Sequence, residues 1–234
     1  MVRQKVIVFG YDFPHWKTTT GLFNMCVNGF KSDLVVLQKK KELTVPHSNY
    51  RVTPKGEYLQ EPREVCELLG IEYVRMDHDT DIGNPDLGII LGARILKKET
   101  IERFTTGILN IHPGILPGNR GLDNLKHSIA KGLPIGVTAH MIDHRIDMGT
   151  IIKTETVPVY EDDTIRDVYI RQRNLEQKVL IEVLKANVFT GTPCTLSEKF
   201  TVINRIADEH IEQLFEEYKQ ENYPEYTINA NQFL

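Results

Sequence analysis

The sequence predicts an α/β fold in which a mostly parallel sheet is flanked by helices. Short, continuous apolar runs, typical of strands buried on both faces, alternate with segments of helical periodicity over the first half of the chain. One helix carries both expected end signals, a proline in its first turn and a glycine just past its last residue. Ligands of such sheets bind beyond the carboxyl ends of the strands. We therefore expect the site in the loops that follow Phe9, Gln38, Leu91 and Ile111.

The predicted elements follow in order along the chain. Apolar runs predict strands over Lys5–Phe9, Asp33–Gln38, Ile71–Arg75, Leu87–Leu91, Ile108–His112, Ile135–Met141 and Ile151–Val159. Helical spacing predicts helices from a cap at Thr18, Thr19 or Thr20 to Phe30, from Glu61 to Gly70, from a cap at Thr164 to about Asn187, and from Ala207 to Gln220. Residues 1–190 are expected to form one domain. Residues 191–234 would be a short C-terminal appendage that makes a homodimer or sheet-edge contact.

Composition and charge exclude several functional classes. The 234 residues include 28 Lys and Arg against 32 Asp and Glu, a formal charge of −4, so the clustered excess of cations that binds nucleic acid is missing. No apolar run approaches the roughly 20 residues of a membrane helix. The N-terminus lacks the longer apolar region of a signal peptide. We expect a cytoplasmic protein with neither a nucleic-acid nor a membrane partner.

Cysteine and histidine spacing does not predict a metal site. Cys26, Cys66 and Cys194 lie far apart and are expected to be reduced. His140 and His144 are four residues apart, but they fall on a strand and a turn, whereas a zinc pair of this spacing requires a helix. No metal is predicted.

Residues 39–60 show no clear periodicity and hold several basic residues, among them Arg51. A solvated turn is the simpler interpretation of the lysine triplet that opens this stretch. A mobile basic flap over a phosphorylated substrate is the functional alternative, because loops of this length are often functional lids.

Polar residues suited to catalysis gather in the segment from Asn110 to Gly121 and in a later turn. Asn110 and His112 are two residues apart on a strand, so their side chains share one face. Histidine gives or takes a proton near neutral pH, and an asparagine amide can donate to a developing oxyanion. Asp147 falls in a glycine-containing turn, where its carboxylate can orient an imidazole or take up a proton. The structural alternative is a capping Asn110, a buried core His112 and an ordinary turn aspartate.

An ordered set of short motifs runs from about Pro85 to Ile152. These motifs are Asn110-x-His112-Pro113, Leu116-Pro117, Arg120-Gly121, Ala130-x-Gly132, Gly136-Val137-Thr138-x-His140 and Asp147-x-Gly149. At this spacing the set resembles the folate-dependent formyltransferase family. Two positions depart from the family pattern: Gly114 stands where serine is frequent and Thr150 where proline is common.

The resemblance implies a Rossmann-like catalytic domain over residues 1–190 that transfers a formyl group from 10-formyltetrahydrofolate to an amine. It places the catalytic asparagine, histidine and aspartate on Asn110, His112 and Asp147. The family's loop that holds the pterin, largely through main-chain groups, corresponds to Ile90, Leu91, Gly92, Ala93, Arg94 and Ile95. The opposing wall would come from the turn 142–147, and His140 and Asp143 complete the expected cofactor contacts.

Within the family the sequence resembles the sugar N-formyltransferases, which act on amino sugars, usually nucleotide-linked, for surface glycans. The methionyl-tRNA branch carries an additional C-terminal domain, for which fewer than fifty residues remain past residue 188. The phosphoribosylglycinamide branch has a glycine- and serine-rich loop after its first strand. Here that place holds Tyr11, Phe13 and Trp16, which would stack on a sugar or base, and Lys17, which with Arg51 would meet phosphates. Packing of these aromatics in the core or at the rim is the structural alternative.

Three other functions stay open at this point. A phosphoribosylglycinamide formyltransferase of purine synthesis shares the motifs. So does a hydrolase that releases formate from the same folate. A non-catalytic binding module is less favoured because all three polar catalytic positions are present.

Overall fold

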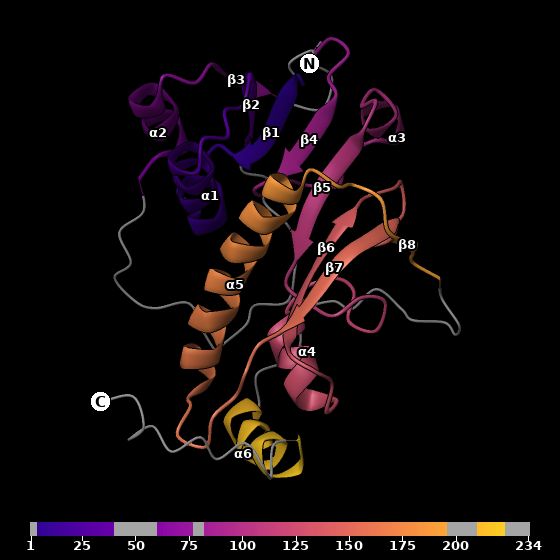
Figure 1. Ribbon diagram of the computed structural model, residues 1–234. Helices are drawn as coiled ribbons and strands as arrows, with labels where there is room; N and C mark the ends of the chain where they lie inside the picture. The colour runs from indigo at the N-terminus through magenta and orange to yellow at the C-terminus, as the bar shows by residue number, and fades with distance from the viewer. Residues whose placement is uncertain (1–3, 40–59, 77–81, 196–209, 223–234) are drawn as a thin grey trace.

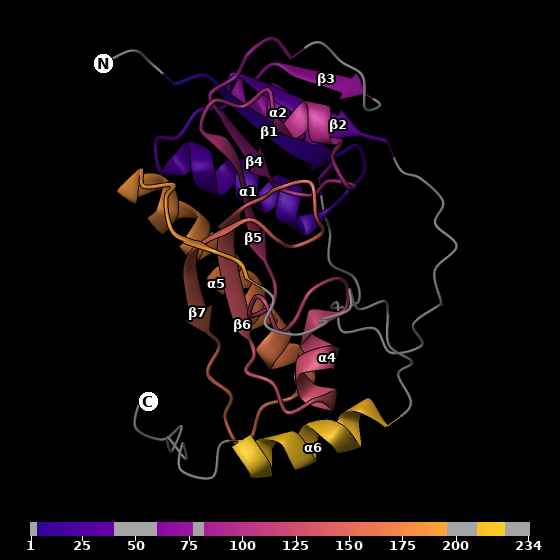
Figure 2. The same cartoon turned by 90° about the vertical axis from the view of Figure 1, so that its right-hand side faces the viewer.

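The computed structural model describes residues 4–39, 60–76, 82–195 and 210–222. These residues form one eight-stranded sheet with helices packed against it (Figures 1 and 2). In chain order the elements are β1 (Val6–Tyr11), α1 (Trp16–Val27), β2 (Leu34–Gln38), α2 (Pro62–Leu69), β3 (Tyr73–Met76), β4 (Leu87–Ile90), α3 (Lys98–Ile101), β5 (Gly107–His112), α4 (Asn124–Ala130), β6 (Gly136–Met141), β7 (Thr150–Thr156), α5 (Ile165–Ala186), β8 (Thr192–Pro193) and α6 (Ile211–Asn222).

The sheet changes from parallel to antiparallel at β5. The strand order is β3-β2-β1-β4-β5-β6-β7-β8. Pairings from β3 to β5 are parallel, whereas β6, β7 and β8 pair antiparallel. The predicted mostly parallel sheet flanked by helices is confirmed. Because β1 pairs with both β2 and β4, the strand order reverses beside it, and such a switch point opens a crevice at the carboxyl ends of the strands.

Strands β1, β2 and β4 are mostly apolar because both faces of the sheet are covered there. In β1, Val8 joins the core cluster that also contains α1 and α5 residues, whereas Ile7 and Phe9 join the cluster on the other face. Figure 1 shows α1, α2 and α5 together on one side of the sheet. Alternate residues of one strand thus serve two different cores.

The start of the first helix differs from the prediction. α1 begins at Trp16 with His15 as its N-cap, so a cap at Thr18, Thr19 or Thr20 is wrong. Thr18 instead lies buried inside the helix, where its hydroxyl donates to the Leu91 carbonyl at 2.7 Å and accepts from the Tyr11 amide at 3.3 Å. This threonine therefore ties the ends of β1 and β4 together.

Other boundaries follow the prediction more closely. The α2 helix begins with Pro62 and is followed by left-handed Gly70, as expected. The α5 helix has the predicted Thr164 cap, a complete capping box with Asp167. β7 ends at Thr156, three residues earlier than expected. The short helices α3 and α4 were not predicted, and the expected start of the last helix at Ala207 lies outside the described residues.

The C-terminal residues contact the sheet edge and the short helix α4. β8 pairs with β7, and Cys194 donates its amide to the Gly149 carbonyl at 2.7 Å. α6 lies beside α4 (Figure 2), with Phe215 buried in their shared cluster and the Tyr218 hydroxyl bonded to the Leu133 carbonyl at 2.9 Å. None of the three cysteines forms a disulfide. Across the part of the chain that the structure describes, we find no helix with the length and apolarity needed to span a bilayer.

Candidate active site

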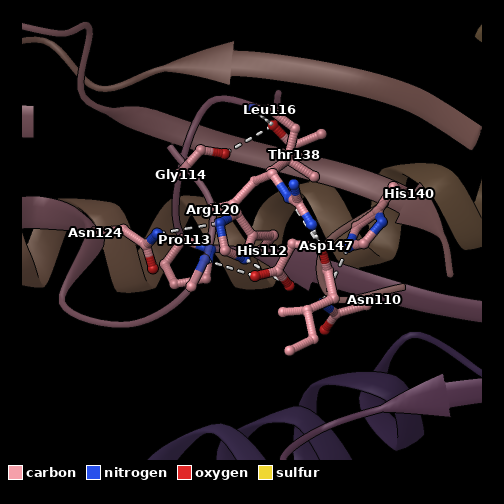
Figure 3. A network of polar contacts seen from close by, with 12 residues as sticks. Asn110, His112, Pro113, Gly114, Leu116, Arg120, Asn124, Thr138, His140 and Asp147 are labelled. Atoms are coloured by element: carbon pink, nitrogen blue, oxygen red, sulfur yellow. Dashed lines mark hydrogen bonds and ion pairs between the residues drawn. The ribbon is translucent and has the colours of Figure 1, made fainter. Parts of the chain in front are cut away.

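The polar centre lies where β5 meets antiparallel β6. The register pairs Asn110 with His140 and His112 with Thr138. Figure 3 shows Asn110, His112, His140 and Asp147 close together on the same side of these strands. The structure thus brings together the three residues predicted to be catalytic.

His140 fixes the orientation of Asn110. Its Nδ1 lies 3.1 Å from the Met148 carbonyl, which is an acceptor, so Nδ1 carries the hydrogen. Its Nε2 is then a lone pair that accepts from Nδ2 of Asn110 at 3.1 Å. His140 is fully buried, and this burial, with the charge of His112 adding to it, lowers the pKa of His140 from 6.5 to about 4. It therefore remains a neutral acceptor for Asn110 across the physiological range.

Two oxygen acceptors face the two ring nitrogens of His112. Nε2 lies 2.8 Å from the Asn119 carbonyl, and Nδ1 lies 3.4 Å from Oδ1 of Asp147. The Asn124 amide nitrogen is also near, 3.2 Å from Nε2 and 3.2 Å from the Asn119 carbonyl that it shares. The long Nδ1 contact leaves this nitrogen the one best placed to shift toward a bound oxygen.

Asp147 is held in an unusual backbone conformation. Its φ is +48°, a left-handed value that non-glycine residues rarely adopt. Its Oδ2 accepts from the Gly121 amide at 2.7 Å, and Arg120 donates to the carbonyl of the preceding residue, Ile146, at 3.0 Å. Burial raises the pKa of Asp147, but the hydrogen bond and charge of His112 and the Gly121 amide outweigh it, so the pKa lies below 3.8. The carboxylate is ionised and directed at the imidazole.

The loop after His112 is closely packed. Thr138 donates to the Gly114 carbonyl at 2.7 Å and accepts from the Leu116 amide at 3.1 Å. The Leu116–Pro117 peptide is cis. A Cβ added to Gly114 would lie 2.8 Å from the Asn119 carbonyl and 3.0 Å from Nε2 of His112. Glycine at position 114 thus leaves room for the contact between Nε2 of His112 and the Asn119 carbonyl. The family that the sequence resembles often has serine at this position.

The loop that resembles a pterin-binding segment lies directly beside Asn110. Ile90 at the end of β4 pairs in register with Asn110, and Leu91 is buried. Gly92 has a φ of +125° and lies against the Tyr11 ring, from which an added Cβ would be 2.7 Å away. The Ala93 carbonyl accepts from the Tyr11 hydroxyl at 3.2 Å.

Arg94 and Asp143, two further residues of the expected cofactor walls, have partners inside the protein. The Arg94 main-chain amide donates to the Gln38 side chain at 2.8 Å. The side chain of the next residue, Ile95, is 68% exposed. On the opposite wall, Asp143 accepts from the Arg145 amide and pairs with its guanidinium. These contacts stabilise the two walls around the centre.

The residues expected to meet the acceptor have different surroundings. Tyr11 and Phe13 stack with ring centroids 4.8 Å apart. The guanidinium of Arg173 lies over the Trp16 ring, with its Cζ atom 4.2 Å from the ring centroid. Lys17, predicted to meet a phosphate, instead forms an ion pair with the buried carboxylate of Glu176. Arg51 lies outside the described residues.

His140, predicted to contact the cofactor, instead has a protein partner for each of its ring nitrogens. Several other residues of the centre were not predicted from the sequence. Asn119 and Asn124 sit in an irregular loop and a helix too short for periodicity to reveal. Gln172 and Glu176 are buried polar residues on an otherwise apolar face of α5, which is a signal that the sequence did contain. Among the described residues, no three His, Cys, Asp or Glu side chains gather as a metal site would require.

Comparison with known proteins identifies the family. The family model described as formyl transferase matches residues 31–184. The mitochondrial methionyl-tRNA formyltransferase of Bos taurus is 34% identical over 191 residues, which cover 79% of this chain and 46% of that protein. Phosphoribosylglycinamide formyltransferase of Haemophilus influenzae is 34% identical over 102 residues, which cover 43% of this chain and 48% of that protein. The chain spans about half the length of these curated relatives.

Solved structures share the fold. An N-formyltransferase from Helicobacter canadensis, in complex with folinic acid and dTDP-3-aminofucose, has a TM-score of 0.62 at 20% identity, covering 87% of this chain and 71% of that one. At this identity the likeness concerns the fold alone. The family model, however, covers well over half of the residues and includes Asn110 and His112 on β5 and the turn with Asp147. The chain therefore belongs to the formyl transferase family.

Proposed function

We propose that this protein is an N-formyltransferase that moves the formyl group of 10-formyltetrahydrofolate to the amine of a nucleotide-linked amino sugar, as a step in surface glycan biosynthesis. The observation that carries the proposal is the convergence of Asn110, His112 and Asp147 at the end of β5. An amide donor, an imidazole and an ionised carboxylate at one point suit acyl transfer to an amine.

The residues present fit a formyl-folate. The Asn110 amide donates one hydrogen to His140, and among the residues that the structure describes no protein acceptor takes the second. That second N–H is available to a bound carbonyl oxygen. Ile90, at the start of this segment, pairs in register with Asn110, and Ile95 at its end supplies exposed apolar surface for a flat ring. We propose that residues 90–95 and Asp143 hold the cofactor.

The three polar residues divide the chemistry. When bound, 10-formyltetrahydrofolate supplies the electrophilic formyl carbon. Asn110 and Nδ1 of His112 donate to the formyl oxygen as it gains negative charge, and removing one such donor typically costs about 10²–10³ in rate. Asp147, whose pKa is lowered, stays ionised and would take the proton of the attacking amine, directly or through water, and return it to the folate nitrogen as the bond between that nitrogen and the formyl carbon breaks. Such proton transfer contributes about 10²–10⁴ in rate.

The choice of acceptor rests on the aromatic residues at the end of β1 and just after it. Tyr11 and Phe13 stack there at the switch point of the sheet, where the phosphoribosylglycinamide branch would have a glycine- and serine-rich loop. Tyr11 is anchored through its hydroxyl to the loop after β4, so this pair lies beside the residues proposed to hold the cofactor. Aromatic faces bind sugars and bases by stacking. The Helicobacter canadensis neighbour, which has an amino-sugar nucleotide bound, supports the same choice.

Phosphoribosylglycinamide is the second candidate acceptor, because a curated relative with that activity is 34% identical over the stretch it matches. A test with one donor and several acceptors separates the candidates. The protein is incubated with 10-formyltetrahydrofolate alone, then with amino-sugar nucleotides, phosphoribosylglycinamide or methionyl-tRNA, and products are scored by mass gain.

We expect mass gain on an amino-sugar nucleotide and no turnover without an acceptor. The Asp147→Asn variant is the matched inactive control. Formylation of phosphoribosylglycinamide or methionyl-tRNA alone would overturn the sugar assignment. Formate release without any amine would show a hydrolase.

A further inference from the structure

We propose that Gln172 and the buried Lys17–Glu176 pair are positioning residues for His112, a role that rests on the proposed formyl transfer. Together they hold the main-chain carbonyls immediately before and after His112. None of the three reaches the catalytic side chains in the structure, so their effect would pass through the backbone.

The carbonyl before His112 is held by a lysine. Lys17 of α1 donates to the Ile111 carbonyl and forms an ion pair with Glu176 of α5 at 2.8 Å. The two side chains are only 12% and 4% exposed. Pairing between β4 and β5 ends at Asn110, so the Ile111 carbonyl lies beyond the last β4 partner. Lys17 therefore supplies the donor that the sheet does not.

The carbonyl after His112 is held by a glutamine. The Gln172 side chain is buried, and its amide nitrogen lies 3.1 Å from the Pro113 carbonyl and 2.9 Å from the Gly136 carbonyl. Gly136 begins β6. One amide group thus joins the end of β5 to the start of its antiparallel neighbour.

The spacing on α5 explains how one helix serves both carbonyls. Gln172 and Glu176 are four residues apart, so they lie on the same face, one turn from each other. That face otherwise packs apolar residues such as Val179 and Val183 against the sheet. A buried ion pair is a weak source of stability, because desolvation offsets the attraction between the charges. Fixing the backbone on both sides of the catalytic histidine is a role that an apolar pair could not fill.

The arrangement also connects the two halves of the proposed site. Lys17 follows directly after Trp16, in the first turn of the helix that leads out of the aromatic segment. Its ammonium group therefore ties the acceptor side of the site to β5 and α5.

The experiment replaces the ion pair without leaving a buried charge. The double variant Lys17→Met/Glu176→Met and the single variant Gln172→Met keep side-chain volume but remove the donors. Because displacement of a reacting group by about 1 Å can cost about 10²-fold, we expect kcat to fall about 10- to 100-fold with KM for both substrates changed less than about threefold. Lys17→Arg, which retains a donor, is expected to keep most of the rate. The matched control is Lys178→Met, which breaks exposed ion pairs of the same helix with Glu155 and Glu182.

A second readout does not depend on the reaction. Protein labelled with ¹⁵N in its histidines reports the ring nitrogens of His112 without any substrate. We expect these resonances to shift in the double variant and in Gln172→Met, and to stay in place in Lys178→Met, while circular dichroism remains native. Unchanged His112 resonances in natively folded variants would overturn the positioning role, whatever the activity. Shifted resonances in a protein that formylates no amine would instead overturn the proposed function and leave the contact to His112 standing.

Discussion

Lowering the pH should destabilise this protein through His140. Burial lowers the pKa of His140 in the folded state to about 4, whereas an unfolded chain has the ordinary value of about 6.5. Between these values the unfolded chain binds more protons than the folded one. Stability therefore rises with pH through this window and is lost as the pH falls from 6.5 toward 4. For one histidine with these two pKa values, the loss from pH 7 to pH 5 is about 2 kcal/mol.

The variant His140→Gln isolates this contribution. A glutamine amide is uncharged, and it can accept from Asn110 while it donates to the Met148 carbonyl. Urea unfolding followed by circular dichroism at pH 7 and pH 5 gives the free energy of unfolding at each pH. We expect the variant to lose about 2 kcal/mol less than the wild type over this interval. The control is His144→Gln, because His144 is exposed, and its loss should equal that of the wild type.

His15 allows a parallel measurement. Burial, and then the charges of Lys17 and Arg173, lower the pKa of His15 to about 4 as well. The His15→Gln variant should therefore also lose about 2 kcal/mol less stability than the wild type between pH 7 and pH 5. An equal loss in wild type and in His140→Gln would refute the reasoning, since it would mean that His140 binds its proton equally in both states.

Three further changes have defined outcomes. Asp147→Asn removes the charge opposite the imidazole and should lower the rate of formyl transfer about 10²–10⁴-fold, measured by product mass, while circular dichroism at 25 °C remains native. Gly114→Ala should lower kcat at least about tenfold, because the new Cβ would lie 2.8 Å from the Asn119 carbonyl; Gly118→Ala, whose Cβ would meet nothing closer than 3.8 Å, should leave kcat unchanged. Thr164→Ala removes the capping box of α5 and should cost about 1 kcal/mol in thermal unfolding, while kcat stays the same.

Residue spacing was sufficient to predict the parallel half of the fold. The runs around Val8, Val35 and Ile89 are apolar because both faces of the sheet are buried, and this pattern is local. The antiparallel direction of β6 could not be read in the same way. A run such as Gly136–Met141 is fully buried and looks alike in either direction, so only the pairing with β5 decides.

The positions of the polar side chains were predictable to a lesser degree. Asn110 and His112 share a strand, and their common face follows from the period of two. Lys17 was expected to meet a phosphate because it follows an aromatic loop, but its partner, Glu176, comes 159 positions later in the sequence. No local pattern connects residues that only the packing of α1 and α5 brings together.

The arrangement of Asp147 explains why Arg120, Gly121 and His140 occur in the same motif set as the catalytic residues. The turn after β6 starts beside Ile108, near the beginning of β5, yet its aspartate reaches His112 at the far end of that strand. The turn must therefore fold back along the sheet, and three contacts stabilise this course: Arg120 holds the Ile146 carbonyl, the Gly121 amide holds the carboxylate, and His140 holds the Met148 carbonyl. His140 acts twice, because the same ring that anchors the turn also orients Asn110 through its other nitrogen. The amide donor and the carboxylate are thereby positioned relative to each other by one buried, neutral imidazole, and a change at His140 should affect both at once.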